Sequence, residues 1–146
     1  MAKSKDTPYK EAQAILDEFS NLAKAPVKVD RILKKIGVTL RFEPMDKDLS
    51  GMVFIKDGTP IVGINSLHHI NRQRFTMAHE LGHLRMHKAE MEREVHVDTQ
   101  LRGMRRDSVS SRGDDLQEIE ANKFASELLM PKHLILQDFG DAPLDE

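Results

Sequence analysis

Two histidines and a glutamate stand at a spacing that suits metal chemistry: His79-Glu80-Leu81-Gly82-His83 follows the pattern HExxH. Residues four apart lie one turn apart on the same face of a helix, so both imidazoles can reach one ion. Glu80 points about 100° away from His79 and can touch a water molecule without binding the ion. The motif therefore predicts His79 and His83 as metal ligands and Glu80 as the catalytic base of a hydrolase.

A catalytic zinc ion takes three protein ligands and keeps one position open, so a third ligand is needed. His87 lies about 12 Å along the helix from His79, too far for one ion to reach both. We expect it to be an exposed or capping histidine near the helix C-terminus. Ala89 occupies the position at which a metzincin carries its third histidine.

A later helix supplies the better candidate for the third ligand. Glu118 and Asn122 lie one turn apart on the face of this helix that carries apolar residues. A carboxylate on a buried face requires a cation, and Asn122 is placed to orient a ligand imidazole. Glu120 lies on the polar face and remains the alternative third ligand.

The residue that stabilises the developing oxyanion is not identified by any pattern. Tyr9, His96 and His133 have suitable chemistry, although surface or packing roles are the simpler expectation for each. His68 and His69 precede the active-site helix and are expected to form a solvated first turn.

Hydrophobic periodicity predicts the elements that hold these residues. A helix is expected at residues 9–24, followed by a short one with Val29, Ile32, Leu33 and Ile36 inward, which Gly37 ends. Strands are expected at 38–42, 51–55 and 60–64, the last two joined at Asp57-Gly58 as an antiparallel hairpin. In zincins the substrate usually adds to an exposed strand edge beside the active-site helix, and if this chain is one, Ile61–Ile64 or its hairpin partner is expected to supply that edge.

The active-site helix is expected from about residue 71 to 87, with apolar residues around most of its circumference, which indicates burial. Residues 97–115 lack periodicity and are expected to form a long loop. A helix at about 115–130 and a short one at 132–139 follow. The fold class expected is α+β: one domain over residues 1–146, with a tail at 1–8 and a small antiparallel or mixed sheet packed on the buried active-site helix.

Composition narrows the functional classes further. The chain has no cysteine, which excludes disulfides, thiolate ligands and a cysteine nucleophile. A formal net charge of −2 gives no global case for nucleic-acid binding, and we expect no membrane partner because no apolar run approaches the length of a span. Without an apolar leader, the expected location is cytoplasmic. An arginine cluster at 102–112 is interpreted as a solvated loop.

Two segments, RFTMAHELGH at 74–83 and EIEANKFASELLMP at 118–131, resemble the ImmA/IrrE family of metallopeptidases. The resemblance implies a zincin-like, gluzincin-type fold, zinc held by His79, His83 and Glu118, and Glu80 as base. It also implies a zinc endopeptidase that cleaves a helix-turn-helix repressor encoded nearby, and so controls stress-response or mobile-element genes. The alternatives are a zinc-bound module that sequesters a regulator without cleaving it, which the presence of Glu80 disfavours, and a metal-dependent amidase.

Overall fold

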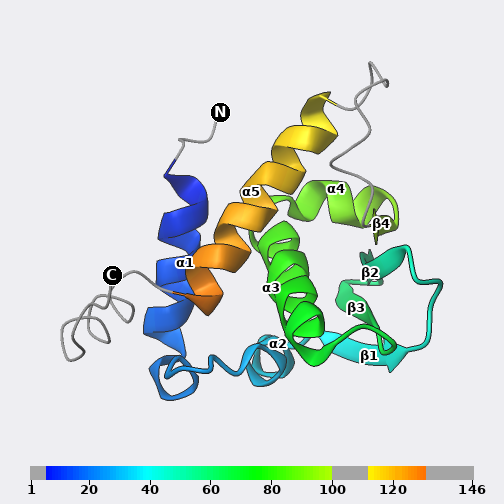
Figure 1. Cartoon of the computed structure of the whole chain (residues 1–146). Helices are drawn as coiled ribbons and strands as arrows, with labels where there is room; N and C mark the ends of the chain where they lie inside the picture. The colour runs from blue at the N-terminus through cyan, green and yellow to red at the C-terminus, as the bar shows by residue number, and fades with distance from the viewer. Residues whose placement is uncertain (1–5, 100–111, 131–146) are drawn as a thin grey trace, which may run out of the picture.

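Four strands form one mixed sheet, and the helices pack against it in layers (Figure 1). The computed structural model describes residues 6–99 and 112–130. The elements are α1 (Thr7–Glu18), a 3-10 turn η1 (Ser20–Leu22), α2 (Val29–Ile36), β1 (Thr39–Glu43), β2 (Leu49–Lys56), β3 (Thr59–Asn65), α3 (Ile70–Met86), α4 (Lys88–Arg93), β4 (His96–Thr99) and α5 (Arg112–Leu129).

The sheet has the strand order β1-β3-β2-β4, with β1 parallel to β3 and the other pairs antiparallel. Asp57 and Gly58 have φ values of 52° and 82°, so both central residues of the turn are left-handed, as a tight hairpin requires. The predicted hairpin is confirmed. The predicted free edge is wrong, because β3 lies between β1 and β2, and β2 lies between β3 and β4.

Helix α3 packs against β2 and β3 on one side and against α5 on the other. It is buried continuously from Thr76 to His83, which accounts for apolar residues on nearly every side of this stretch. Helix α5 crosses α3 and also packs on α1, so two distant segments of the chain enclose the active-site helix (Figure 1). The α+β class and the sheet packed on a buried helix are confirmed.

The first helix differs from its predicted bounds at both ends. Pro8 is buried in the first turn of α1, where its fixed φ suits a helix, so the predicted tail at 1–8 extends too far. Helix α1 ends at Glu18 rather than near Lys24, and η1 follows. Ser20 and Asn21 are weak helix formers, which explains the early end. Gly37, with φ of 102°, ends α2 as predicted, although Ile36 is 40% exposed rather than inward.

The predicted loop at 97–115 is wrong at both ends, because 97–99 belong to β4 and 112–115 to α5. Strand β4 turns His96 and Asp98 inward, so it lacks the alternating apolar residues by which a strand is recognised. Helix α4 was not predicted. Residues 100–111, the predicted helix at 132–139 and His133 lie outside the described residues.

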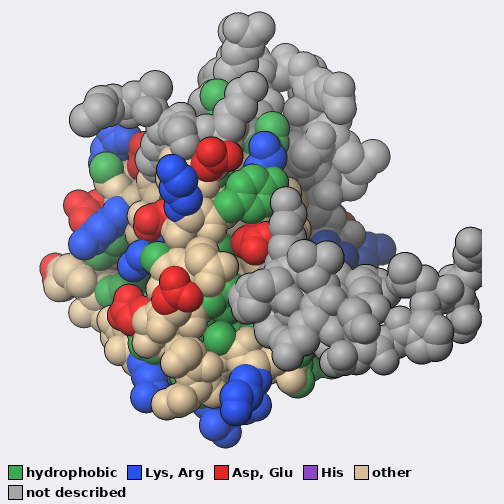
Figure 2. Space-filling model, turned by 90° about the vertical axis from the view of Figure 1, so that its left-hand side faces the viewer, with side chains coloured by type: hydrophobic (Ala, Val, Ile, Leu, Met, Phe, Trp, Pro, Cys, Tyr) green, Lys and Arg blue, Asp and Glu red, His purple; other side chains and the backbone are tan. Residues whose placement is uncertain are grey.

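The face that lies to the left in Figure 1 carries basic and acidic side chains interspersed, as Figure 2 shows. This arrangement produces no single-sign field over the described residues of that face. Within residues 6–99 and 112–130, no helix has both the length and the apolar character needed to cross a bilayer.

Candidate metal centre

Five side chains from three elements converge on one point: His79 and His83 of α3, His96 and Asp98 of β4, and Glu118 of α5. Each offers one nitrogen or oxygen ligand atom, and these atoms all lie within 4.8 Å of one another. The four residues of α3 and β4 are buried, and the side chain of Glu118 is 14% exposed. The structure thus brings the three predicted ligand residues together and adds two that were not predicted as ligands.

The predicted ligand residues meet through their inward-facing atoms. Glu118 Oε2 lies 2.6 Å from His83 Nε2 and 3.4 Å from His79 Nε2. The two imidazoles approach each other at 3.1 Å between their Nε2 atoms. The spacing of four residues places both rings on one face of α3, and α5 brings the carboxylate to that face.

Strand β4 adds a histidine and an aspartate to this group. His96 Nε2 lies 3.1 Å from Asp98 Oδ1 and 3.2 Å from Glu118 Oε2. Asp98 Oδ1 also lies 3.2 Å from His79 Nε2. The sequence signal for this pair is His-x-Asp, since residues two apart share one face of a strand. His96 is predicted only as a candidate oxyanion stabiliser or as a surface or packing residue, and no prediction includes Asp98.

The opposite ring nitrogens of the α3 histidines contact a different set of residues. His79 Nδ1 donates to Asn122 Oδ1 at 2.8 Å. His83 Nδ1 lies 3.0 Å from His87 Nδ1, and His87 Nε2 lies 2.8 Å from Glu120 Oε1. His87 is the C-cap residue of α3, which confirms the capping role; it is only 3% exposed, so the alternative of an exposed histidine is wrong. Glu120 contacts His87 and lies outside the group of five.

Glu80 is fully buried beside this group, and its carboxyl group hydrogen-bonds to Asp98. The facing strand β2 makes room for it with a glycine. A Cβ atom at Gly51 would lie 3.3 Å from Glu80 Oε2, and it would collide with the carbonyl oxygen of Gly63 at 2.6 Å. The absence of a side chain at Gly51 therefore lets the sheet approach the predicted catalytic base.

The three histidines differ in pKa because they differ in their carboxylate partners. Burial alone would lower the pKa of His79 and His96, but hydrogen bonds with Asp98 and Glu118 raise these pKa values to about 10 and about 9. For His83, burial prevails over the hydrogen bond to Glu118 and lowers the pKa to about 4.

The carboxylates of Glu118 and Asp98, which contact these histidines, also have shifted pKa values. Burial alone would raise the pKa of Glu118, but hydrogen bonds with His79, His83 and His96 lower it to about 2. The pKa of Asp98 is likewise lowered by its hydrogen bonds with Glu80, His79 and His96, against the effect of burial. The positive charges of protonated His79 and His96 thus offset the negative charges of Glu118 and Asp98. A divalent cation at this point would offset the same two negative charges. The donor set fits a metal ion.

The remaining candidates lie elsewhere. Tyr9 is on α1 and 40% exposed. His68 contacts the carbonyl oxygen of Lys47 at 3.0 Å, and His69 caps the N-terminus of α3.

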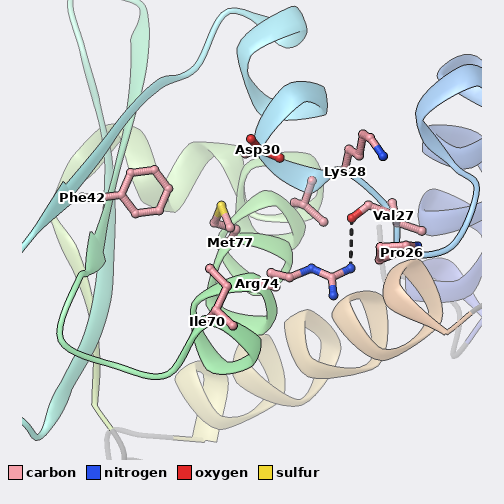
Figure 3. A pocket seen from close by; sticks show the side chains of 9 residues that line it. Pro26, Val27, Lys28, Asp30, Phe42, Ile70, Arg74 and Met77 are labelled. Carbon is pink, nitrogen blue, oxygen red and sulfur yellow. Dashed lines mark hydrogen bonds between the residues drawn. The ribbon is translucent and has the colours of Figure 1, made fainter.

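A separate pocket of about 290 Å³ lies beside the first half of α3, and Figure 3 shows its lining. Arg74 points across it and donates from Nη2 to the carbonyl oxygen of Val27 at 3.1 Å. The pocket is lined by Pro26, Val27, Lys28, Val29, Asp30, Phe42, Ile70, Arg74 and Met77. The five converging side chains are absent from this lining.

Comparison with known proteins identifies one family. The model of a peptidase family, described as the IrrE N-terminal-like domain, matches residues 33–145. That range covers most of the chain and contains all five converging residues. No curated protein matches the chain.

Proposed function

This chain belongs to the peptidase family of the IrrE N-terminal-like domain, and we propose that it is a zinc metalloendopeptidase. In this proposal His79, His83 and Glu118 hold the ion and Glu80 is the catalytic base. The observation that carries it is the approach of Glu118 Oε2 to both α3 imidazoles, at 2.6 and 3.4 Å, with Glu80 buried alongside.

A divalent ion in this group would offset the charge of the buried carboxylates Asp98 and Glu80 and of the partly exposed Glu118. When bound, zinc lowers the pKa of a water molecule towards about 7 and polarises the scissile carbonyl group. The carboxylate of Glu80 takes the proton of that water and delivers it to the leaving amine nitrogen. The amide oxygen of Asn122 accepts from Nδ1 of His79, so with a metal bound it would keep the proton on Nδ1 and leave Nε2 free as the ligand atom.

The proposed substrate is a protein, specifically a helix-turn-helix transcriptional repressor encoded nearby, so that cleavage would induce the repressed genes. The support for this choice is the resemblance of both motifs to ImmA/IrrE metallopeptidases. An extended substrate segment would pair with the outer edge of β4, which is the terminal strand beside β2 and carries two of the five converging residues.

The test compares cleavage of the neighbouring repressor by the wild type, Glu80→Gln and Glu92→Gln, with and without a chelator. Glu80→Gln keeps the shape of the side chain and removes its basicity, whereas Glu92 lies exposed on α4 and serves as the control. We expect chelator-sensitive cleavage by the wild type and the control, and zinc binding without cleavage by Glu80→Gln. Equal cleavage by Glu80→Gln would overturn the assignment of the base. Equal binding of the repressor without cleavage by any protein would favour a sequestration module instead.

A further inference from the structure

We propose that His96 and Asp98 of strand β4 are additional metal ligands, so that the chain supplies five protein donors rather than three. This inference rests on the proposed metal site. It assigns a chemical role to β4, whose four residues include two buried polar side chains that the proposed hydrolysis does not otherwise use.

The direction of the contacts supports this assignment. A residue that merely orients a ligand imidazole binds the ring nitrogen that faces away from the ion. Asn122 does so at Nδ1 of His79, and His87 lies at Nδ1 of His83. Asp98 lies instead against His79 Nε2, the nitrogen that faces the ion site.

His96 shows the same orientation as Asp98. Its Nε2 atom lies 3.2 Å from Glu118 Oε2, the oxygen that also approaches Nε2 of both α3 imidazoles. The rings of His83 and His96 have their centroids 4.3 Å apart, so β4 brings a third imidazole to the group that α3 and α5 form.

The separations of the donor atoms match a shared coordination shell. Ligands bound at about 2.0–2.2 Å to one ion lie roughly 3 Å from their neighbours in the shell. The six contacts among these five donors range from 2.6 to 3.4 Å. All five atoms lie within 4.8 Å of one another, little more than twice a typical bond length of about 2.2 Å.

Five donors change what the ion can accept. They would leave about one position of a six-coordinate shell, so a water molecule and the scissile carbonyl group could not both bind the ion until a β4 donor is released. Helices α3 and α5 would then hold the ion. The short edge strand β4 would determine how many coordination positions are left for non-protein ligands.

The test uses the full chain, freed of metal and reloaded with one equivalent of Zn²⁺. X-ray absorption at the zinc edge counts bound imidazoles, and competition with a chromophoric chelator gives the affinity. The variants are His96→Ala, His96→Gln and Asp98→Asn. The matched control is Val97→Thr, because Val97 lies between the two donors and points to the other face of β4. Thermal unfolding of each metal-free variant checks that it folds.

We expect three imidazoles in the wild type and the control, two in both His96 variants and three in Asp98→Asn. All three donor variants should bind zinc more weakly by more than the roughly 10- to 100-fold typical of outer partners. Two imidazoles in the folded wild type, with affinity unchanged in the donor variants, would overturn the inference and leave the three-ligand site standing. Unchanged zinc binding by His79→Ala would instead overturn the proposed function.

Discussion

Gly82 lies directly against Phe124: a Cβ atom at Gly82 would stand 3.0 Å from Cδ1 and 3.2 Å from Cβ of the fully buried phenylalanine. This contact is the close approach of α3 to α5. The residue after Gly82 is His83, and α5 carries Glu118 to within 2.6 Å of its Nε2 atom. The small size of one residue thus permits two distant segments to share a site.

A larger residue at Gly82 should separate these helices. We expect Gly82→Val to lower the free energy of unfolding by about 1–3 kcal/mol, the usual cost of overpacking, and to weaken zinc binding because Glu118 moves away from His83. Thermal unfolding and chelator competition measure the two effects. Lys123→Val, at an exposed position of α5, controls for placing valine in a helix. Unchanged zinc affinity in Gly82→Val would show that the approach of the helices is not required.

Removing the partner of His79 Nδ1 should weaken metal binding without removing it. Asn122→Ala deletes the oxygen that accepts from His79 at 2.8 Å, and we expect the affinity for zinc to fall about 10- to 100-fold. Asn122→Asp keeps an acceptor oxygen and should restore most of the affinity. Chelator competition distinguishes the two variants. Equal losses in both would indicate a packing role for Asn122.

The two glutamates of α5 should respond differently to truncation. Glu118 contacts the Nε2 atoms of three histidines, whereas Glu120 contacts His87. We expect Glu118→Ala to lose zinc binding, and Glu120→Ala to lose at most the roughly 10- to 100-fold of an outer partner. Metal content after dialysis reports the difference. The reverse order of losses would identify Glu120 as the third ligand.

Alkaline pH should destabilise the metal-free protein. The pKa of His79 is raised from 6.5 to about 10, and that of His96 to about 9. Their charged forms therefore contribute stability that is fully present below pH 6.5 and is lost as pH rises through these folded-state values. Zinc binding replaces the protons, so the loaded protein should lack this loss. Denaturant unfolding at several pH values above 6.5, with and without zinc, should show a gap that widens with pH. A constant gap would contradict the pairing of these imidazoles with Asp98 and Glu118.

Local patterns in the sequence determined the features that depend on residues only a few positions apart in the chain. The spacing of His79 and His83 places both rings on one helix face, and Asp57-Gly58 forms the turn that only left-handed residues accommodate. The inward direction of Glu118 follows from the periodicity of its own helix. These features depend on backbone geometry that repeats along the chain.

Tertiary structure decided which side chains meet across elements. His96 and Asp98 form a buried pair on a strand of four residues, too short and too polar for a period-two pattern to be recognised. His87 is buried because Glu120 of α5 lies against it, and the hairpin strands are internal because β1 and β4 flank them. Such contacts join residues far apart in the chain, and no local preference encodes them. The sequence by itself therefore determined the motif and the helix that carries it, and the packing of β4 and α5 decided which residues surround it.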